Sequence, residues 1–218
     1  MSKLQVRVAA TKEEEDDVFQ PVDQLPEDLI PTSMQVMKFS GQHLSLEEDN
    51  TYFDWPGFKT AIDHYTGDDL SFDRYDKSTI NQQSQEAGAM IDKVAQFLKD
   101  AFNAVVDMTQ LAAIILNTFT NLKEHSESGF LQFSKSDDKH NSSWEYRVLF
   151  SVPFQNTPSF FYSLVTTIKI TADIEEESSW WGLTSSTKRN FGVQVDALQL
   201  VVQKGFRAPI PSSKAKLA

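Results

Sequence analysis

The longest alternating segment of the chain runs from Phe160 to Glu175, FFYSLVTTIKITADIE. Every second residue, counted from Phe160, is mainly apolar, and the residues between them become more polar along the segment. This period of two predicts a β-strand with one apolar face. At about 3.3 Å per residue it would reach roughly 50 Å, whereas ordinary strands have about five or six residues. A strand of this length can belong to an ordinary sheet, or it can exchange a helical cover for lipid.

Two other segments alternate in the same way. Trp144–Pro153 is apolar at every second position, and Phe191–Val202 begins with the same pattern. The apolar parity of the second segment changes by one residue near Asp196 and Ala197, which predicts a β-bulge at that point. Shorter strands or strand edges are predicted at Leu4–Val8, Leu70–Tyr75, Phe130–Ser134 and Trp180–Leu183.

Apolar residues that recur every three or four positions predict four helices. The last two are the strongest, and their short connection predicts an antiparallel hairpin. The four segments are Met34 to about Leu44, Phe58–Tyr65 behind the N-cap Asp54, Ile80–Val105 behind the N-cap Ser78, and Met108–Leu122 behind the N-cap Asp107.

The order of these elements indicates the fold class. Helices come first and long strands that can pair antiparallel come last, which is typical of an α+β fold. A length of 218 residues suits a single domain with a sizeable core. Within residues 1–218 we predict an acidic, proline-containing arm over residues 1–33 and a flexible basic tail over residues 205–218.

Charge and cysteine content narrow the possible functions. The net charge of −11 disfavours nucleic acid as a partner and opposes simple attraction to anionic lipid. The absence of cysteine excludes disulfides, thiolate catalysis and cysteine zinc sites. The N-terminus has no signal-peptide core, and the longest apolar run, Leu111–Leu116, is too short for a membrane helix. We therefore expect a chain made soluble and then secreted or released, which meets a membrane only by rearranging.

The sequence contains no pattern that is specific for catalysis. The acidic cluster Asp68–Asp76 lacks the glycine and terminal glutamate of an EF-hand, and there is no phosphate loop or nucleophile elbow. We predict no enzyme activity, metal or cofactor, although carboxylates that only the fold brings together, as in a hydrolase, remain open. Four histidines have no partner at metal-ligand spacing: His43, His64, His125 and His140.

Three segments share their order and spacing with one known family. They are Met90–Lys99 (MIDKVAQFLK), Gln110–Leu122 (QLAAIILNTFTNL) and Glu145–Pro153 (EYRVLFSVP). In this arrangement they resemble the cytolytic delta-endotoxins, the Cyt-type toxins of insecticidal bacteria, and their fungal relative volvatoxin. The resemblance covers about Leu70 to Gln203, and the N-terminal third matches only loosely.

This resemblance implies a fold and an activity. The fold would be a single α+β domain with helical hairpins packed on both faces of a sheet of long antiparallel strands. The activity would be membrane lysis, by a pore or by disruption of lipid, with homo-oligomers that form on the bilayer. Members of the family act on zwitterionic or unsaturated phospholipids, which is consistent with the negative charge of this chain.

The resemblance and the strand pattern together assign roles to residues. Lys188 and Arg189, in a polar turn, are candidates for contact with lipid headgroups, although a plain turn also accounts for them. The predicted inserting strand residues are Trp144, Tyr146, Val148, Phe150, Phe160, Tyr162, Leu164, Ile168, Ile170, Phe191, Val193 and Val195. The predicted helix cover, which would also serve oligomerisation, comprises Ile91, Val94, Leu98, Phe102, Leu111, Ile115, Phe119 and Leu122.

Three alternatives stay open from the sequence. The chain can be a soluble lipid- or ligand-binding relative that never inserts. It can disrupt membranes like a detergent, without a defined pore. The helix that contains Leu111–Leu116 can also be the inserting element, lying in the membrane interface while the strands stay in the sheet.

Overall fold

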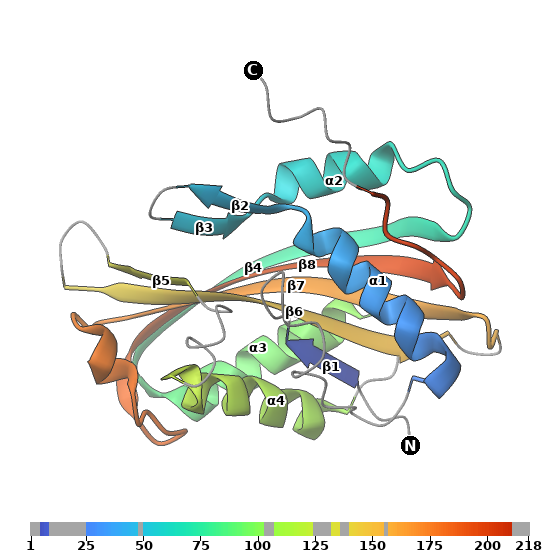
Figure 1. Ribbon diagram of the computed structural model, residues 1–218. Helices are drawn as coiled ribbons and strands as arrows, with labels where there is room; N and C mark the ends of the chain where they lie inside the picture. Colours follow the sequence, from blue (N-terminus) through green and yellow to red (C-terminus); the bar gives the residue numbers. More distant parts are fainter. Residues whose placement is uncertain are drawn as a thin grey trace.

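The protein has a central antiparallel sheet with helices on both faces (Figure 1). This arrangement confirms the predicted α+β fold. The helices in the described part of the chain are all too short or too polar to cross a membrane. The computed structural model describes residues 5–8, 25–47, 50–102, 107–123, 132–135, 140–154 and 157–210.

The sheet is six-stranded, with the order β1-β6-β7-β8-β4 and β5 beside β6. The two shortest strands, β1 and β5, pair with different halves of β6. The long strands β6, β7, β8 and β4 lie next to one another in that order. The strands are β1 (Gln5–Val8), β4 (Leu70–Glu86), β5 (Gln132–Lys135), β6 (Ser142–Pro153), β7 (Phe160–Ala172) and β8 (Lys188–Gln203).

The helices divide between the two faces of the sheet (Figure 1). We call the face covered by α3 (Ala87–Ala101) and α4 (Met108–Thr120) face A. Face B is the opposite face, which lies under the remaining helices and a small hairpin. These are the 3-10 turn η1 (Glu27–Leu29), α1 (Ile30–Gly41), β2 (Leu44–Glu47), β3 (Asn50–Phe53) and α2 (Trp55–Asp63).

Two of the predicted helix starts are confirmed by their caps. The Asp54 carboxylate accepts a hydrogen bond from the backbone N–H of Gly57 at 3.0 Å, at the start of α2. The Asp107 carboxylate accepts one from the N–H of Thr109 at 2.8 Å, at the start of α4. Each cap satisfies a backbone donor that has no partner within its own helix.

The centre of the sheet is buried on both faces. Along β7, Leu164 and Ile168 belong to the core on face A, whereas Phe161 and Val165 belong to the core on face B. This arrangement explains the alternating pattern of β7 and the absence of strongly polar residues at its centre. Two apolar cores therefore share the long strands.

The bulge predicted near Asp196 and Ala197 is wrong. The β7–β8 register runs through Thr167↔Asp196 and Thr166↔Ala197 without a shift. The apolar parity changes because β8 contributes residues up to Ala197 to the face A core, and Leu198, Leu200 and Val202 to the face B core. The helices on face B cover only one half of the sheet, so only that half of β8 is apolar on face B.

The helix predicted behind Ser78 is wrong before Ala87. Residues up to Glu86 continue β4, which pairs with β8 as far as Glu86↔Lys188. Irregularities do occur in β4, where the register shifts between Phe72 and Arg74 and again between Gln82 and Gln85. The polar side chains that resembled exposed helical turns instead lie on a partly exposed strand.

The N-terminal arm is shorter than predicted. Leu29 is buried and α1 begins at Ile30, so the prediction of an extended arm up to Ser33 is wrong for its last residues. Pro31 lies in the first turn of α1, where the missing N–H leaves no helical hydrogen bond unmade. The rest of the arm, with the acidic run Glu13–Asp17, lies outside the described residues.

Two further segments differ from their predictions. Residues 205–210 are not a free tail, because Phe206 is buried and the N–H of Ala208 donates to the Gln35 side chain at 3.2 Å. Residues 211–218 lie outside the described part. The strand edge predicted at Trp180–Leu183 is wrong: Trp180 ends the 3-10 turn η2 (Glu177–Trp180) and donates from Nε1 to Ser142 Oγ at 2.8 Å.

The aromatic cluster of the face B core gives a test of the fold. Phe58 is 0% exposed and its ring contacts those of Phe39 and Phe53. We expect Phe58→Ala to lower the free energy of unfolding by about 3–5 kcal/mol, measured by urea denaturation. Phe72, 50% exposed, is the matched control, and its change to alanine should cost less than about 0.5 kcal/mol. Equal losses would contradict the placement of Phe58.

Candidate functional site: the two faces of the sheet

The predicted inserting residues gather on face A. All of them except Phe160 and Tyr162 belong to one buried cluster, Tyr162 is partly buried against it, and the cluster residues form rows across β6, β7 and β8. One row is Trp144, Ile170 and Val193, and the next contains Ile168 between Tyr146 and Val195. Phe160 lies instead at the beginning of β7, where its ring contacts Phe154 with the centroids 6.5 Å apart.

The predicted helix cover packs against this same face. Phe102 contacts Phe150 with ring centroids 6.3 Å apart, and Phe119 contacts Phe191 at 5.9 Å. The whole predicted set belongs to the face A cluster: Ile91, Val94, Leu98, Phe102, Leu111, Ile115, Phe119 and Leu122. In the folded protein these two helices therefore cover the apolar side chains of face A.

Face A also buries polar atoms that have no hydrogen-bond partner in the described part of the chain. They are Trp144 Nε1, the Tyr146 hydroxyl and Thr166 Oγ1. Burial raises the pKa of Tyr146 above its ordinary value. An unmade hydrogen bond at a buried donor or acceptor typically costs about 1–3 kcal/mol. The contact between face A and its cover is thus mainly apolar, and it leaves these three polar atoms of the sheet without hydrogen bonds to the described residues.

Polar contacts tie the face B cover to the sheet. Trp55 Nε1 donates to Thr167 Oγ1 at 3.0 Å, and the Lys59 ammonium lies 3.2 Å from the centroid of the Tyr75 ring. The Tyr75 hydroxyl in turn donates to the buried Asp196 carboxylate. Helix α2 is therefore fixed to β4 and β7 by directional contacts as well as by apolar packing.

Arg147 is a buried cation beneath the face B cover. It is 6% exposed, and its Nε and Nη1 atoms have no hydrogen-bond partner among the described residues. Its guanidinium carbon lies 5.8 Å from the centroid of the Phe53 ring, and a Cβ at Gly41 would lie 3.4 Å from Nη2. Burial lowers the pKa of Arg147 to about 10, because desolvation disfavours the charged form.

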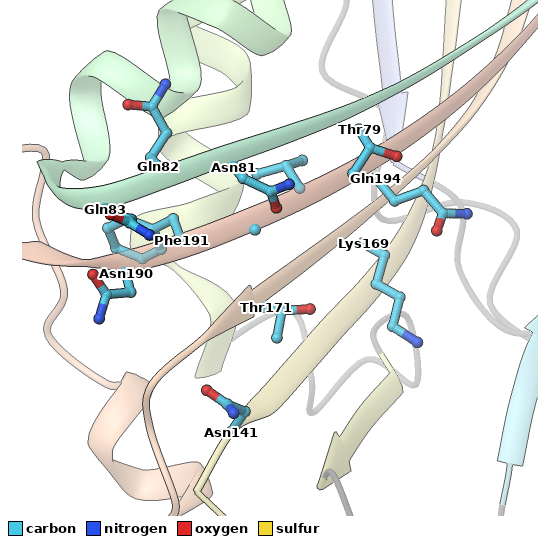
Figure 2. A pocket seen from close by; sticks show the side chains of 12 residues that line it. Thr79, Asn81, Gln82, Gln83, Asn141, Lys169, Thr171, Asn190, Phe191 and Gln194 are labelled. Atoms are coloured by element: carbon cyan, nitrogen blue, oxygen red, sulfur yellow. The ribbon is translucent and has the colours of Figure 1, made fainter.

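Beyond α1 and α2, face B is open and polar. Figure 2 shows a shallow hollow on this part of the sheet, with Asn81, Gln194 and Thr171 on one side of the ribbon and Gln82 directed the other way, towards a helix. The hollow is lined by amide and hydroxyl side chains together with Lys169. In this half of the sheet, one face is apolar and covered while the other is polar and in contact with water.

Several charged side chains around the open, polar half of face B lie near a group of opposite charge. Burial raises the pKa of the Glu145 carboxyl, an effect that nearby Lys169 opposes. Lys188 lies 3.7 Å from the Glu86 carboxylate, and Arg189 is exposed beside Gln85. Lys188 and Arg189 are the first residues of β8, so their placement in a turn was wrong.

The described histidines do not form a metal site. His140 lies 3.2 Å from the Glu175 carboxylate at the surface, and His64 contacts the carbonyl oxygen of Thr60 within its own helix. Burial lowers the pKa of His43. Within the described part of the chain, no group of three or more histidine or acidic side chains could hold a metal ion.

Comparison with known families agrees with this geometry. A family model described as Bacillus thuringiensis toxin matches residues 46–210, which is more than half of the chain. The chain belongs to this toxin family. The matched region contains the three long strands, α3 and α4.

Individual relatives are distant in sequence. The Type-2Bb cytolytic delta-endotoxin of Bacillus thuringiensis subsp. jegathesan is 26% identical over 137 residues, which are 61% of this chain and 51% of the relative. The Type-1Ba cytolytic delta-endotoxin of subsp. neoleoensis is 25% identical over 144 residues, 65% of this chain and 51% of the relative. The chain thus spans about half the length of the curated relatives it matches.

Solved structures confirm the Cyt-like fold. A delta-endotoxin structure matches with a TM-score of 0.70 and 19% identity, and the match covers 85% of this chain and 81% of the other. An activated Cyt2Ba monomer from Bacillus thuringiensis subsp. israelensis matches with a TM-score of 0.69 and 16% identity, covering 82% and 94%. The resemblance to fungal volvatoxin stays a prediction.

The burial of Arg147, which has no ion-pair partner among the described residues, leads to a prediction about stability. Arg147→Met keeps the bulk of the side chain and removes the buried cation, so we expect the free energy of unfolding to rise by about 1–4 kcal/mol in urea denaturation. Arg74→Met is the control, because Arg74 is partly exposed and paired with Asp76 at 2.6 Å. Its change should be within about 1 kcal/mol.

The pH dependence of this difference tests the cause. Burial lowers the pKa of Arg147 to about 10 in the folded protein, whereas the unfolded chain keeps this proton to a higher pH. Between these values the unfolded state binds more protons, so the wild-type protein gains stability as the pH rises. The advantage of Arg147→Met should therefore shrink from about pH 9 to about pH 11. A constant difference would contradict a desolvated charge.

Proposed function

We propose that this chain is a membrane-lytic toxin that binds phospholipid bilayers, forms homo-oligomers on them and inserts its long amphipathic strands. The family match and the cytolytic relatives support lysis as the activity. We propose a physical mechanism, without an enzymatic step or cofactor. The inserting elements would be the face A residues of β6, β7 and β8.

The observation that carries this proposal is the difference between the two covers. Helices α3 and α4 meet face A mainly through apolar side chains, whereas α2 meets face B through a hydrogen bond and a cation–π contact as well. Lipid tails are as apolar as leucine and can replace the first kind of contact. Hydrocarbon cannot replace the second kind. The face A cover is therefore the one that a bilayer can displace.

Once uncovered, face A of β6, β7 and β8 would match the thickness of a bilayer as well as its polarity. Trp144 lies in one row of face A and Tyr162 in a row eight residues along β6, a separation of roughly 26 Å. The hydrocarbon core of a bilayer is about 30 Å thick, and tryptophan and tyrosine favour its two interfaces. The open half of face B would then meet water, with Lys169 and Thr171 among its side chains.

Insertion of strands requires an assembly. An unpaired strand edge in hydrocarbon costs several kcal/mol for each unsatisfied backbone group. The outer edge of β4 is the last in the strand order of the sheet, so this edge would need the strands of a second copy. The net charge of −11 favours zwitterionic over anionic lipid as the target. Lys188 and Arg189 stay candidates for headgroup contact at one end of β8.

Release of trapped dyes from vesicles tests the activity. With phosphatidylcholine vesicles we expect the protein to release a small dye and retain a large one, as a discrete pore would. Release should be slower when an anionic lipid is added, because the protein and the surface then repel each other. Release of both dyes would favour detergent-like disruption. No release, even after protease trimming of the N-terminus, would indicate a soluble binding relative or another function.

Quenching by brominated lipid tests which face meets the bilayer. Trp144 lies on face A and Trp55 lies on face B, so bromine on the acyl chains should quench the first and spare the second. Trp180 and Trp181 also belong to the face A side of the sheet, so both are first changed to phenylalanine. In that background we expect Trp144→Phe to remove most of the quenching, and Trp55→Phe to leave it nearly unchanged. If Trp144→Phe changes nothing while the vesicles leak, insertion of the face A strands is wrong.

A further inference from the structure

We propose that α3 and α4 leave face A as one hinged unit, with a bulge at Ser84 as the hinge and residues 184–187 as a clasp that holds it closed. This inference rests on the proposed function, for which it names the regulating contact. It starts from the junction of β4 and α3. The strand ends at Glu86 and the helix begins at Ala87, so no loop separates them.

The hinge is an irregularity at the end of β4. The β4–β8 register shifts between Gln82 and Gln85, and Ser84 has a φ of 49°, in the left-handed region that residues other than glycine rarely adopt. The backbone N–H of Ser84 donates to the Asn190 side chain at 2.9 Å. Such conformations persist only when surrounding contacts impose them. Loss of those contacts would allow the chain to turn here.

The clasp is the turn that leads into β8. The residue before α3, Glu86, gives the helix no side-chain cap. Instead the N–H of Ala87 donates to the Thr187 carbonyl at 2.9 Å, and the N–H of Gly88 donates to the Ser185 carbonyl at 2.8 Å. The first donors of α3 are therefore satisfied by a different part of the chain, which must be in place for the helix start to be capped.

The close approach at the clasp depends on a glycine. A Cβ at Gly88 would lie 3.3 Å from the Ser185 carbonyl oxygen, tighter than ordinary contact. The turn is braced internally, because the N–H of Thr184 donates to Thr187 Oγ1 at 2.9 Å and the N–H of Thr187 donates back to the Thr184 carbonyl at 3.0 Å. The clasp is thus a preformed turn that binds two backbone donors.

The unit that would move is continuous in the chain. The described residues between 87 and 120 form α3 and α4, which are not strands of the sheet. Opening at Ser84 would therefore break only the two strand pairs beyond the hinge, Gln85↔Arg189 and Glu86↔Lys188. At the far end of α3, Arg74 Nη1 donates to the Asp100 carbonyl over a long 3.4 Å at the surface. Opening would expose the clasped N–H groups to water and give the apolar face to lipid.

An engineered disulfide tests the clasp directly. The chain has no cysteine, and a Cβ at Gly88 would lie 3.6 Å from Ser185 Cβ, within the range of disulfides. We expect oxidised Gly88→Cys/Ser185→Cys to release dye from phosphatidylcholine vesicles at least tenfold more slowly than its reduced form. Addition of a reductant should restore release. Equal release by the oxidised and reduced forms would overturn the clasp while leaving the lytic function intact.

A second disulfide serves as a matched control. A Cβ at Gly192 would lie 3.8 Å from Thr171 Cβ, so Gly192→Cys/Thr171→Cys links β7 to β8 within the sheet, where no separation is proposed. Its oxidised and reduced forms should release dye at equal rates. A loss on oxidation as large as that of the clasp variant would show that opening is not specific to α3, and would also overturn the inference.

Hydrogen exchange tests the hinge without any membrane. We expect the amides of α3 and α4 to exchange together, at least tenfold faster than the paired amides of β7 and β8. The clasp disulfide should slow this exchange and leave that of α1 unchanged. Exchange of α3 and α4 at the rate of the sheet would overturn the inference, whether or not vesicles leak. Failure of the hinge is thereby distinguished from failure of the lytic function.

Discussion

The apolar face of the long strands must be covered, and the rest of the structure follows from how that requirement is met. Face A carries a continuous band of large side chains from β6, β7 and β8. In water, α3 and α4 provide the cover and bury it against their own apolar stripes. This interaction is strong but has no direction, so any apolar surface of sufficient size can take the place of the helices. A bilayer is such a surface.

The structure of face B explains why the proposed mechanism displaces the α3–α4 cover alone. Its apolar core occupies one half of the sheet, where Leu198 and Val202 face α1, α2 and the packed segment near Phe206. Hydrogen bonds from this segment to Thr32 and Gln35 connect the C-terminal part of the chain to α1. The other half of face B has no apolar requirement. One half of the sheet is therefore covered on both faces, whereas the other half has an apolar face A and a polar face B.

The sequence predicts those helices and strands whose hydrophobic periodicity comes from packing against an apolar core. The helical period of α3 and α4 reflects burial against the sheet, and the alternation in β6 and β7 reflects the apolar side chains of face A, so the sequence predicts these elements. The second half of β4 was not predicted, because Thr79 and Asn81 face water and its strand state comes from pairing with β8. Arg147 gave no signal either, since a single arginine at an alternate position is ordinarily exposed. Its burial depends on α1 and β3, which are distant in the chain.

Partner changes at the membrane also explain a weakness of the closed state. In the closed state, the Tyr146 hydroxyl and Trp144 Nε1 are buried and have no hydrogen-bond partner among the described residues. At a membrane interface the same aromatic side chains would place their rings in the lipid and their polar atoms beside headgroups and water. On the proposed mechanism, opening therefore exchanges apolar contact for apolar contact and gains hydrogen bonds that the folded monomer lacks. The bias towards opening would then reside in the buried polar atoms of face A, while the clasp on α3 opposes it.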